Sequence, residues 1–146
     1  MERKINGAIA KYGGRAKLVS VECLPRLQEE IAKFRQQEKL NNFQNWIVSE
    51  LYSFELPKTS FPIRSVILIA EARPGYAKVI LNYHGKSYVV FSLIAGKEKE
   101  INSALAALIA TEGYHIVPAD RLPFKRLAVQ SGLAVYGRNN ITLSLI

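Results

Sequence analysis

The stretch with the most specific chemical potential runs from Gly132 to Asn139 and reads Gly-Leu-Ala-Val-Tyr-Gly-Arg-Asn. Two glycines followed by a cation match the outline of a phosphate-binding loop, Gly-x4-Gly-Lys-Ser/Thr. In that loop the lysine meets phosphate and the hydroxyl holds magnesium, and the loop follows a strand and opens a helix. Here Arg138 replaces the lysine, Asn139 replaces the hydroxyl, and the segment follows an expected helix. The sequence therefore argues against ATP binding.

The histidines and the single cysteine do not form a metal-binding or nucleophilic pattern. A zinc or non-haem iron site needs three or four ligands, and neither His84 nor His115 has a carboxylate or thiol at ligand spacing. Cys23 precedes an expected helix start, where the helix dipole can lower a thiol pKa. A lone cysteine there is more often a small buried hydrophobe. No metal site is predicted.

Composition and charge indicate one soluble domain in a reducing compartment. The chain has 146 residues, one cysteine and a net charge of +8. It has no apolar run near the ~20 residues that span a bilayer and no apolar leader region, so we expect a cytoplasmic protein. The one asymmetry lies at the end, where no acid follows Asp120 and the basic residues are Arg121, Lys125, Arg126 and Arg138. A basic face attracts phosphate or nucleic acid, and a solvated surface is the plainer interpretation.

Hydrophobic periodicity and glycine or proline boundaries predict the elements that must position these residues. Helices are predicted at Glu2–Tyr12, Pro25–Lys39, Asn42–Leu51, Lys97–Glu112 and Pro123–Gly132. Strands are predicted at Ala16–Val21, Val66–Ala70, Ala77–Tyr83, Lys86–Phe91, Tyr114–Val117 and Asn140–Leu145. Adjacent strands flanked by helices indicate an α+β fold, with a mixed or antiparallel central sheet, as one domain spanning residues 1–146.

The continuous apolar run Val66–Ala70 is typical of a strand covered on both faces. We expect it to share a sheet with the two strands of the hairpin around His84-Gly85, with the Lys97–Glu112 helix packed across that sheet. An exposed Ile67 or Ile69 would contradict this expectation.

Aromatic and aliphatic residues of the helix that Asn42 is expected to cap recur at i, i+3, i+4 and i+8. They are Phe43, Trp46, Ile47 and Leu51. This spacing predicts a helix whose apolar face packs on the core.

The C-terminal stretch Leu122–Asn140 resembles a segment of the epoxyqueuosine-reductase-like iron–sulfur proteins. In that family a helix containing Pro-x-Lys/Glu leads into Gly-Leu-Gly-x-x-Gly-Lys/Arg-Asn. Here the helix begins at Leu122-Pro123 and the motif reads Gly-Leu-Ala-Val-Tyr-Gly-Arg-Asn, with Ala134 at the second glycine. The order of the upstream elements is similar, so the resemblance spans most of the chain. Its specific part is Ala128–Asn140.

The resemblance implies a cobalamin-binding domain with a nitroreductase-like fold, which in that family receives electrons from two four-iron clusters and reduces epoxyqueuosine in tRNA. On this basis Asp120 matches the family's proton-donating acid. The implied cofactor contacts are Gly132, Leu133, Tyr136, Gly137, Arg138 and Asn139. One four-iron cluster needs four cysteines, so this chain cannot ligate one. We therefore expect the corrinoid-binding N-terminal half alone, without reductase activity of its own.

The resemblance also sets expectations about partners. They are tRNA or an iron–sulfur electron-donor domain, no membrane, and a homo-oligomer favoured by apolar surface near Leu143–Ile146. Two alternatives remain open from the residues themselves. One is a non-catalytic interaction module on the same fold, and the other is a basic RNA-binding domain.

Overall fold

The computed structural model describes residues 1–37, 40–71, 76–93, 96–119, 121–136 and 142–144. Its helices are α1 (Glu2–Ile9), η1 (Ala10–Tyr12), η2 (Val21–Cys23), α2 (Leu24–Gln37), α3 (Asn42–Trp46), η3 (Ile47–Leu51), α4 (Glu98–Thr111) and α5 (Phe124–Gln130). Its strands are β1 (Gly14–Ser20), β2 (Ser65–Glu71), β3 (Tyr76–Tyr83), β4 (Lys86–Leu93), β5 (Ala134–Tyr136) and β6 (Thr142–Ser144). The described strands pair as β1–β2, β3–β4 and β5–β6, all antiparallel. The fold is α+β with small antiparallel sheets.

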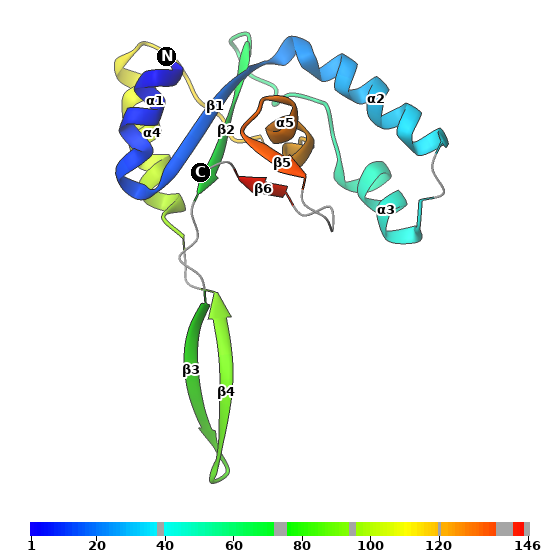
Figure 1. The fold of residues 1–146 in the computed structure, drawn as a ribbon. Coiled ribbons are helices and arrows are strands. Elements are labelled where there is room, and N and C mark those ends of the chain that lie inside the picture. Colours follow the sequence, from blue (N-terminus) through cyan, green and yellow to red (C-terminus); the bar gives the residue numbers. More distant parts are fainter. Residues whose placement is uncertain (38–39, 72–75, 94–95, 120, 137–141, 145–146) are drawn as a thin grey trace.

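The body of the molecule is built on the ribbon of β1 and β2. In its register Gly14 lies opposite Glu71 and Ser20 opposite Ser65. Helices α1 and α4 lie on one side of this ribbon, and α2 and α5 lie on the other (Figure 1). Because alternate residues of a strand point to opposite faces, each face of the ribbon contributes to a different hydrophobic core.

The first core, which we call the α1–α4 core, lies between those two helices and β1. Ile5 and Ile9 of α1 lie one helical turn apart, as do the apolar residues of α4, so each helix buries a single stripe. The buried members are Ile5, Ile9, Ala16, Ile101, Leu105 and Ile109. Gly14 lies against Ile9 and Ile101, and a Cβ there would come within 3.2 Å of both side chains. The close approach of strand to helices therefore uses a glycine.

The second core, which we call the α2–α5 core, covers the opposite face of the ribbon. Its buried members are Leu24, Leu27, Ile31, Val66, Leu68, Leu122, Leu127 and Leu133. Next to this core, the end of η3 is held in place, because the Arg121 guanidinium donates to the carbonyls of Glu50 and Leu51. The backbone of Ser53 also donates to the Arg121 carbonyl at 2.8 Å. These bonds satisfy carbonyls at the end of η3 that the helix leaves without partners.

Strands β3 and β4 form a hairpin that projects from the body (Figure 1). Its two-residue turn has positive φ at both positions, 47° at His84 and 72° at Gly85, as a type I′ turn requires. The hairpin is confirmed, but the central sheet predicted to unite it with β2 is wrong. Strand β2 instead pairs with the N-terminal strand β1, Gly14–Ser20. Ile69 is 39% exposed, which contradicts full cover of the apolar run.

Two further predictions need correction. Asn41, not Asn42, caps α3, because its side chain accepts from the Gln44 N–H in a capping box. The helix is not core-facing either, since Phe43 is 66% exposed and Trp46 49% exposed. Residues 114–117 form no strand, although their apolar content suggested one. Within the described part of the chain, no helix has the length and apolar character needed to cross a bilayer.

Candidate functional site

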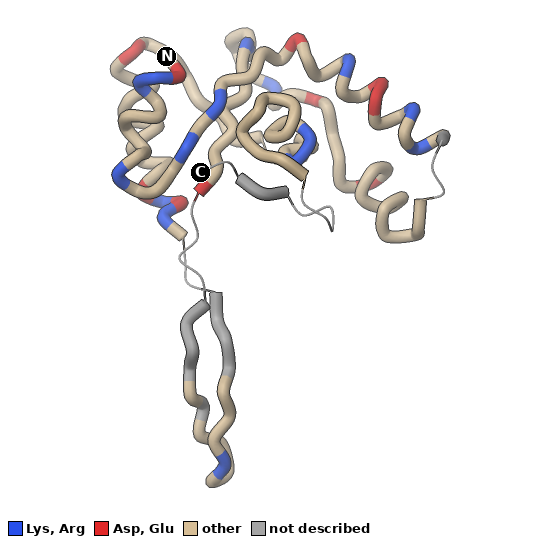
Figure 2. Tube along the Cα trace, in the orientation of Figure 1, with Lys and Arg blue, Asp and Glu red and all other residues tan. Residues whose placement is uncertain are grey.

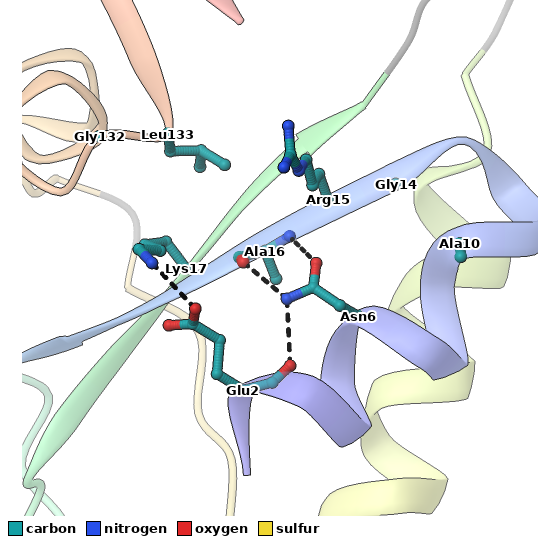
Figure 3. Close-up of a pocket in the computed structure, with 9 residues that line it drawn as sticks. All are labelled: Glu2, Asn6, Ala10, Gly14, Arg15, Ala16, Lys17, Gly132 and Leu133. Carbon is teal, nitrogen blue, oxygen red and sulfur yellow. Dashed lines mark hydrogen bonds and ion pairs between the residues drawn. The ribbon is translucent and has the colours of Figure 1, made fainter. Parts of the chain in front are cut away.

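A pocket of about 530 Å³ lies along the outer edge of β1. It is bounded by α1, by β1 and by the turn between α5 and β5 (Figure 3). The lining residues are Glu2, Asn6, Ala10, Gly14, Arg15, Ala16, Lys17, Gly132 and Leu133. Its volume lies within the roughly 300–1,000 Å³ of small-molecule sites.

The β1 wall is held by a side-chain clamp from α1. Asn6 Oδ1 accepts from the Ala16 N–H at 2.8 Å, and Asn6 Nδ2 donates to the Ala16 carbonyl at 2.9 Å. The amide side chain thus takes the place of a neighbouring strand. Nδ2 also donates to the Glu2 carbonyl at 3.0 Å, which fixes the amide to its own helix (Figure 3). An open strand edge is thereby closed to other partners.

Glu2 extends this clamp along β1 to Leu18, two residues beyond Ala16. Its carboxylate accepts from the Leu18 N–H at 2.9 Å and from Lys17 Nζ at 3.0 Å. The Leu18 hydrogen bond lowers the pKa of the Glu2 carboxyl below its ordinary value, with a smaller contribution from the hydrogen bond of Lys17. The carboxylate is therefore charged at neutral pH and balances one cation of β1.

The opposite wall comes from the turn after α5. Gly132 has φ 74°, the left-handed conformation that glycine adopts without strain. Its N–H donates to the Val129 carbonyl at 3.0 Å, and the Leu133 N–H donates to the Ala128 carbonyl at 2.9 Å, so the helix ends in a Schellman motif. Both N–H groups are used by the helix end, so they are not free for a ligand. Gly132 and Leu133 instead shape the pocket wall, and the Leu133 side chain is buried.

The structure brings only part of the predicted site together. Gly132 and Leu133 lie in the pocket wall, and Tyr136 follows on β5 with 46% of its surface exposed. Four predicted residues lie outside the described residues, namely Asp120, Gly137, Arg138 and Asn139. Sequence reasoning missed the β1 wall, with Glu2, Asn6, Arg15 and Lys17. These residues come from two elements and form no motif.

The basic residues near the site have mixed roles. Lys and Arg lie along β1 and on α5 (Figure 2). Arg126 lies over the Phe34 ring at 5.0 Å, and Arg121 caps η3, so both contribute to packing of the fold. Lys125 is exposed. The acid-free end is therefore a less continuous charged face than its sequence indicates.

The two histidines and the cysteine considered for metal or thiol chemistry occupy positions in the fold that explain them without such chemistry. His84 forms the hairpin turn, and His115 stacks on Phe61 with ring centroids 4.9 Å apart. Burial raises the pKa of the Cys23 thiol, so the thiol is protonated at neutral pH. Among the described residues, no three His, Cys, Asp or Glu side chains are grouped as a metal site would need.

No protein-family model, curated protein or solved structure matches this chain.

Proposed function

We propose that this chain is a corrinoid-binding domain of redox type, related to the epoxyqueuosine reductases, and that it acts with a separate iron–sulfur electron donor. On this proposal the fold is of the nitroreductase-like corrinoid-binding type, and the substrate class is a modified nucleoside of tRNA. The proposal rests on the Ala128–Asn140 motif and on the position of that motif's first residues at a pocket.

The observation that carries the proposal is the wall made by Gly132 and Leu133. These residues come from the motif, and they face the cationic strand β1 across a pocket of about 530 Å³. A planar macrocycle with an anionic tail needs a flat apolar wall beside positive charge. Leu133 supplies the first. Arg15 supplies the second, together with Lys17, whose charge is partly balanced by Glu2.

The exposed residues of β5 fit the same ligand class. Val135 is 41% exposed and Tyr136 46% exposed, beside the buried Leu133 and Ala134. These two side chains extend the apolar wall beyond the pocket, as a ligand wider than the pocket requires. When bound, a corrinoid supplies a cobalt centre for reductive chemistry. The residues of this chain would hold and orient it, and Asp120 remains the proposed proton donor.

Hydroxocobalamin titration, followed by visible absorption, tests the proposal. We expect a saturable spectral change, and Tyr136→Ala should weaken binding about fivefold, because an aromatic packing contact contributes about 1 kcal/mol. Tyr114→Ala is the matched control. Tyr114 is 61% exposed and lies outside the pocket lining, so its removal should leave binding unchanged. Parent protein that gives no spectral change at millimolar ligand would refute the corrinoid proposal.

A second candidate function, a non-catalytic interaction module, is favoured by one observation. Phe43 and Trp46 stack with ring centroids 6.0 Å apart on the outside of α3, and Leu51 nearby is also exposed. Aromatic side chains are enriched at the centres of protein interfaces. Without corrinoid binding, this function takes the place of the first.

A further inference from the structure

Two strand edges of this molecule are complementary but lie apart. The first is the edge of β2 that faces away from β1. Ala16 uses its N–H and carbonyl on Asn6, so the Ala16–Ile69 pair is not hydrogen-bonded across the ribbon. The backbone groups of Ile69, and of every second residue from it, therefore point away from β1. These residues are Ser65, Ile67, Ile69 and Glu71.

The second edge belongs to β3. The two-residue turn makes Tyr83 and Lys86 the first hydrogen-bonded pair of the hairpin. Every second residue back from Tyr83 then bonds to β4, and the residues between them present their N–H and carbonyl groups outward. These residues are Tyr76, Lys78, Ile80 and Asn82.

In one antiparallel register, the outward N–H and carbonyl groups of β2 and β3 all face one another. If Ser65 lies opposite Asn82, each outward residue of β2 meets an outward residue of β3. The pairs are Ser65–Asn82, Ile67–Ile80, Ile69–Lys78 and Glu71–Tyr76. The residues between them pair as Val66–Leu81, Leu68–Val79 and Ala70–Ala77. Apolar residues thus oppose one another in every central pair except Ile69–Lys78, and a polar pair lies at one end.

The exposure of two apolar side chains supports the same register. Ile69 is 39% exposed and Ile80 62% exposed, and the register would bring both into one sheet. A shift of the register by one residue would instead put outward backbone groups of one strand opposite inward backbone groups of the other. It would also move the side chains of β3 to the opposite face of the sheet.

We propose that β3 of a second copy of this chain pairs with β2 in this register, and that the two copies exchange hairpins reciprocally. The hairpin stands away from its own body in Figure 1, so its edge is presented to another molecule. The end of β2 and the start of α4 are joined by a hydrogen bond, because the Glu71 carboxylate accepts from the Lys97 N–H. Among the residues that the structure describes, none hydrogen-bonds to the outward backbone groups of β2 or β3, and a two-fold exchange would satisfy these groups in both copies. A two-stranded hairpin alone is marginally stable, and the exchange gives it further strands.

Cysteine cross-linking tests both the pairing and its partner. The variant Ser65→Cys/Asn82→Cys is made with Cys23→Ser, because Ser65 and Asn82 are exposed and their replacement spares the cores. A hydrogen-bonded antiparallel pair has Cα atoms about 5.5 Å apart, which suits a disulfide. Under mild oxidation we expect a disulfide-linked species of twice the 16.4 kDa chain mass on a non-reducing gel. Light scattering of the parent should give the same doubled mass.

The control pair is Ser65→Cys/Ser87→Cys, because Ser87 lies opposite Asn82 on β4, one strand further from β2 in the proposed sheet. It should cross-link at least tenfold more slowly. A disulfide formed only within one chain would overturn the second copy as the occupant, since the hairpin would then close on its own β2. Absence of any disulfide in the Ser65–Asn82 variant would overturn the pairing itself. Neither result depends on whether a corrinoid binds.

Discussion

The replacement Asn6→Ala removes the clamp that completes β1. Asn6 makes three hydrogen bonds of 2.8 to 3.0 Å, and two of them go to Ala16. Ala16 is only 4% exposed, so its N–H and carbonyl would lose their partners where water has limited access. An unsatisfied buried group costs roughly 1–3 kcal/mol. Because Asn6 itself is partly exposed, we take the lower end of that range, about 1–1.5 kcal/mol for each group, and expect a total of about 2–3 kcal/mol.

Urea unfolding followed by circular dichroism measures this loss. With an m value of about 2 kcal/mol/M, typical of small proteins, the midpoint should fall by about 1–1.5 M. The variant Asn6→Asp keeps an acceptor for the Ala16 N–H but brings a carboxylate oxygen against the Ala16 carbonyl, so it should also destabilise. The matched control is Asn102→Ala on the exposed side of α4, where alanine's higher helix propensity makes the change neutral or slightly stabilising.

Amide hydrogen exchange distinguishes local loss of the Asn6 hydrogen bonds from a loss of stability across the whole protein. In Asn6→Ala the Ala16 amide should exchange faster than the global stability loss explains, whereas amides of α4 should follow the global change. The reasoning is refuted if Asn6→Ala unfolds within 0.5 M urea of the parent, because the edge of β1 would then not depend on the side chain.

Two further predictions concern the two walls of the pocket. The folded-state pKa of Glu2 is lowered, so its contribution to stability is present above the ordinary carboxyl pKa and is lost as pH falls through the folded value. Glu2→Gln should therefore lower the melting temperature at pH 7, by the equivalent of about 1 kcal/mol after screening at this partly exposed site. The gap to the parent should narrow as the pH of a thermal series falls below the ordinary carboxyl pKa. A gap that stays constant with pH would contradict the assignment. Gly132→Ala should cost about 1–2 kcal/mol, because φ is 74° there although no neighbour lies within 4 Å. Gly7→Ala, within α1 and equally uncrowded, should instead stabilise by about 0.5–1 kcal/mol in the same urea titration, and equal effects at both glycines would contradict the backbone argument.

Local signals accounted for most of the helices and for the hairpin. The stripe of α4 and its stop at Gly113 depend on residues close in sequence, and so does the His84-Gly85 turn. The predicted Pro123–Gly132 helix is confirmed as α5 with its glycine cap. The periodicity of α3 was real, but the prediction of a buried face failed. Spacing specifies which residues share a face and not whether another element covers it.

The arrangement of the strands could not be predicted in the same way. The apolar run of β2 specifies a strand with cover but does not identify its neighbour, and the nearest strands in sequence were chosen. The structure instead pairs β2 with β1 across a long sequence separation. The pocket was missed for a related reason, since Glu2 and Asn6 act through backbone groups of β1 and not through a motif. Gly132 and Leu133 were found because they belong to a local motif.

The two cores carry a consequence for how the chain acquires its structure. The α1–α4 core joins Ile5 to Ile109, and the α2–α5 core joins Leu24 to Leu133. Contacts of such high sequence separation form only after the loop between them has been closed, at an entropic cost that slows folding. During synthesis the ribosome must therefore release the chain past Leu133 before the second core can close. Until then the face of β2 that belongs to the α2–α5 core, and the apolar residues of α2, lack the cover of α5, so the nascent chain passes through an extended period in which chaperones would have access to both.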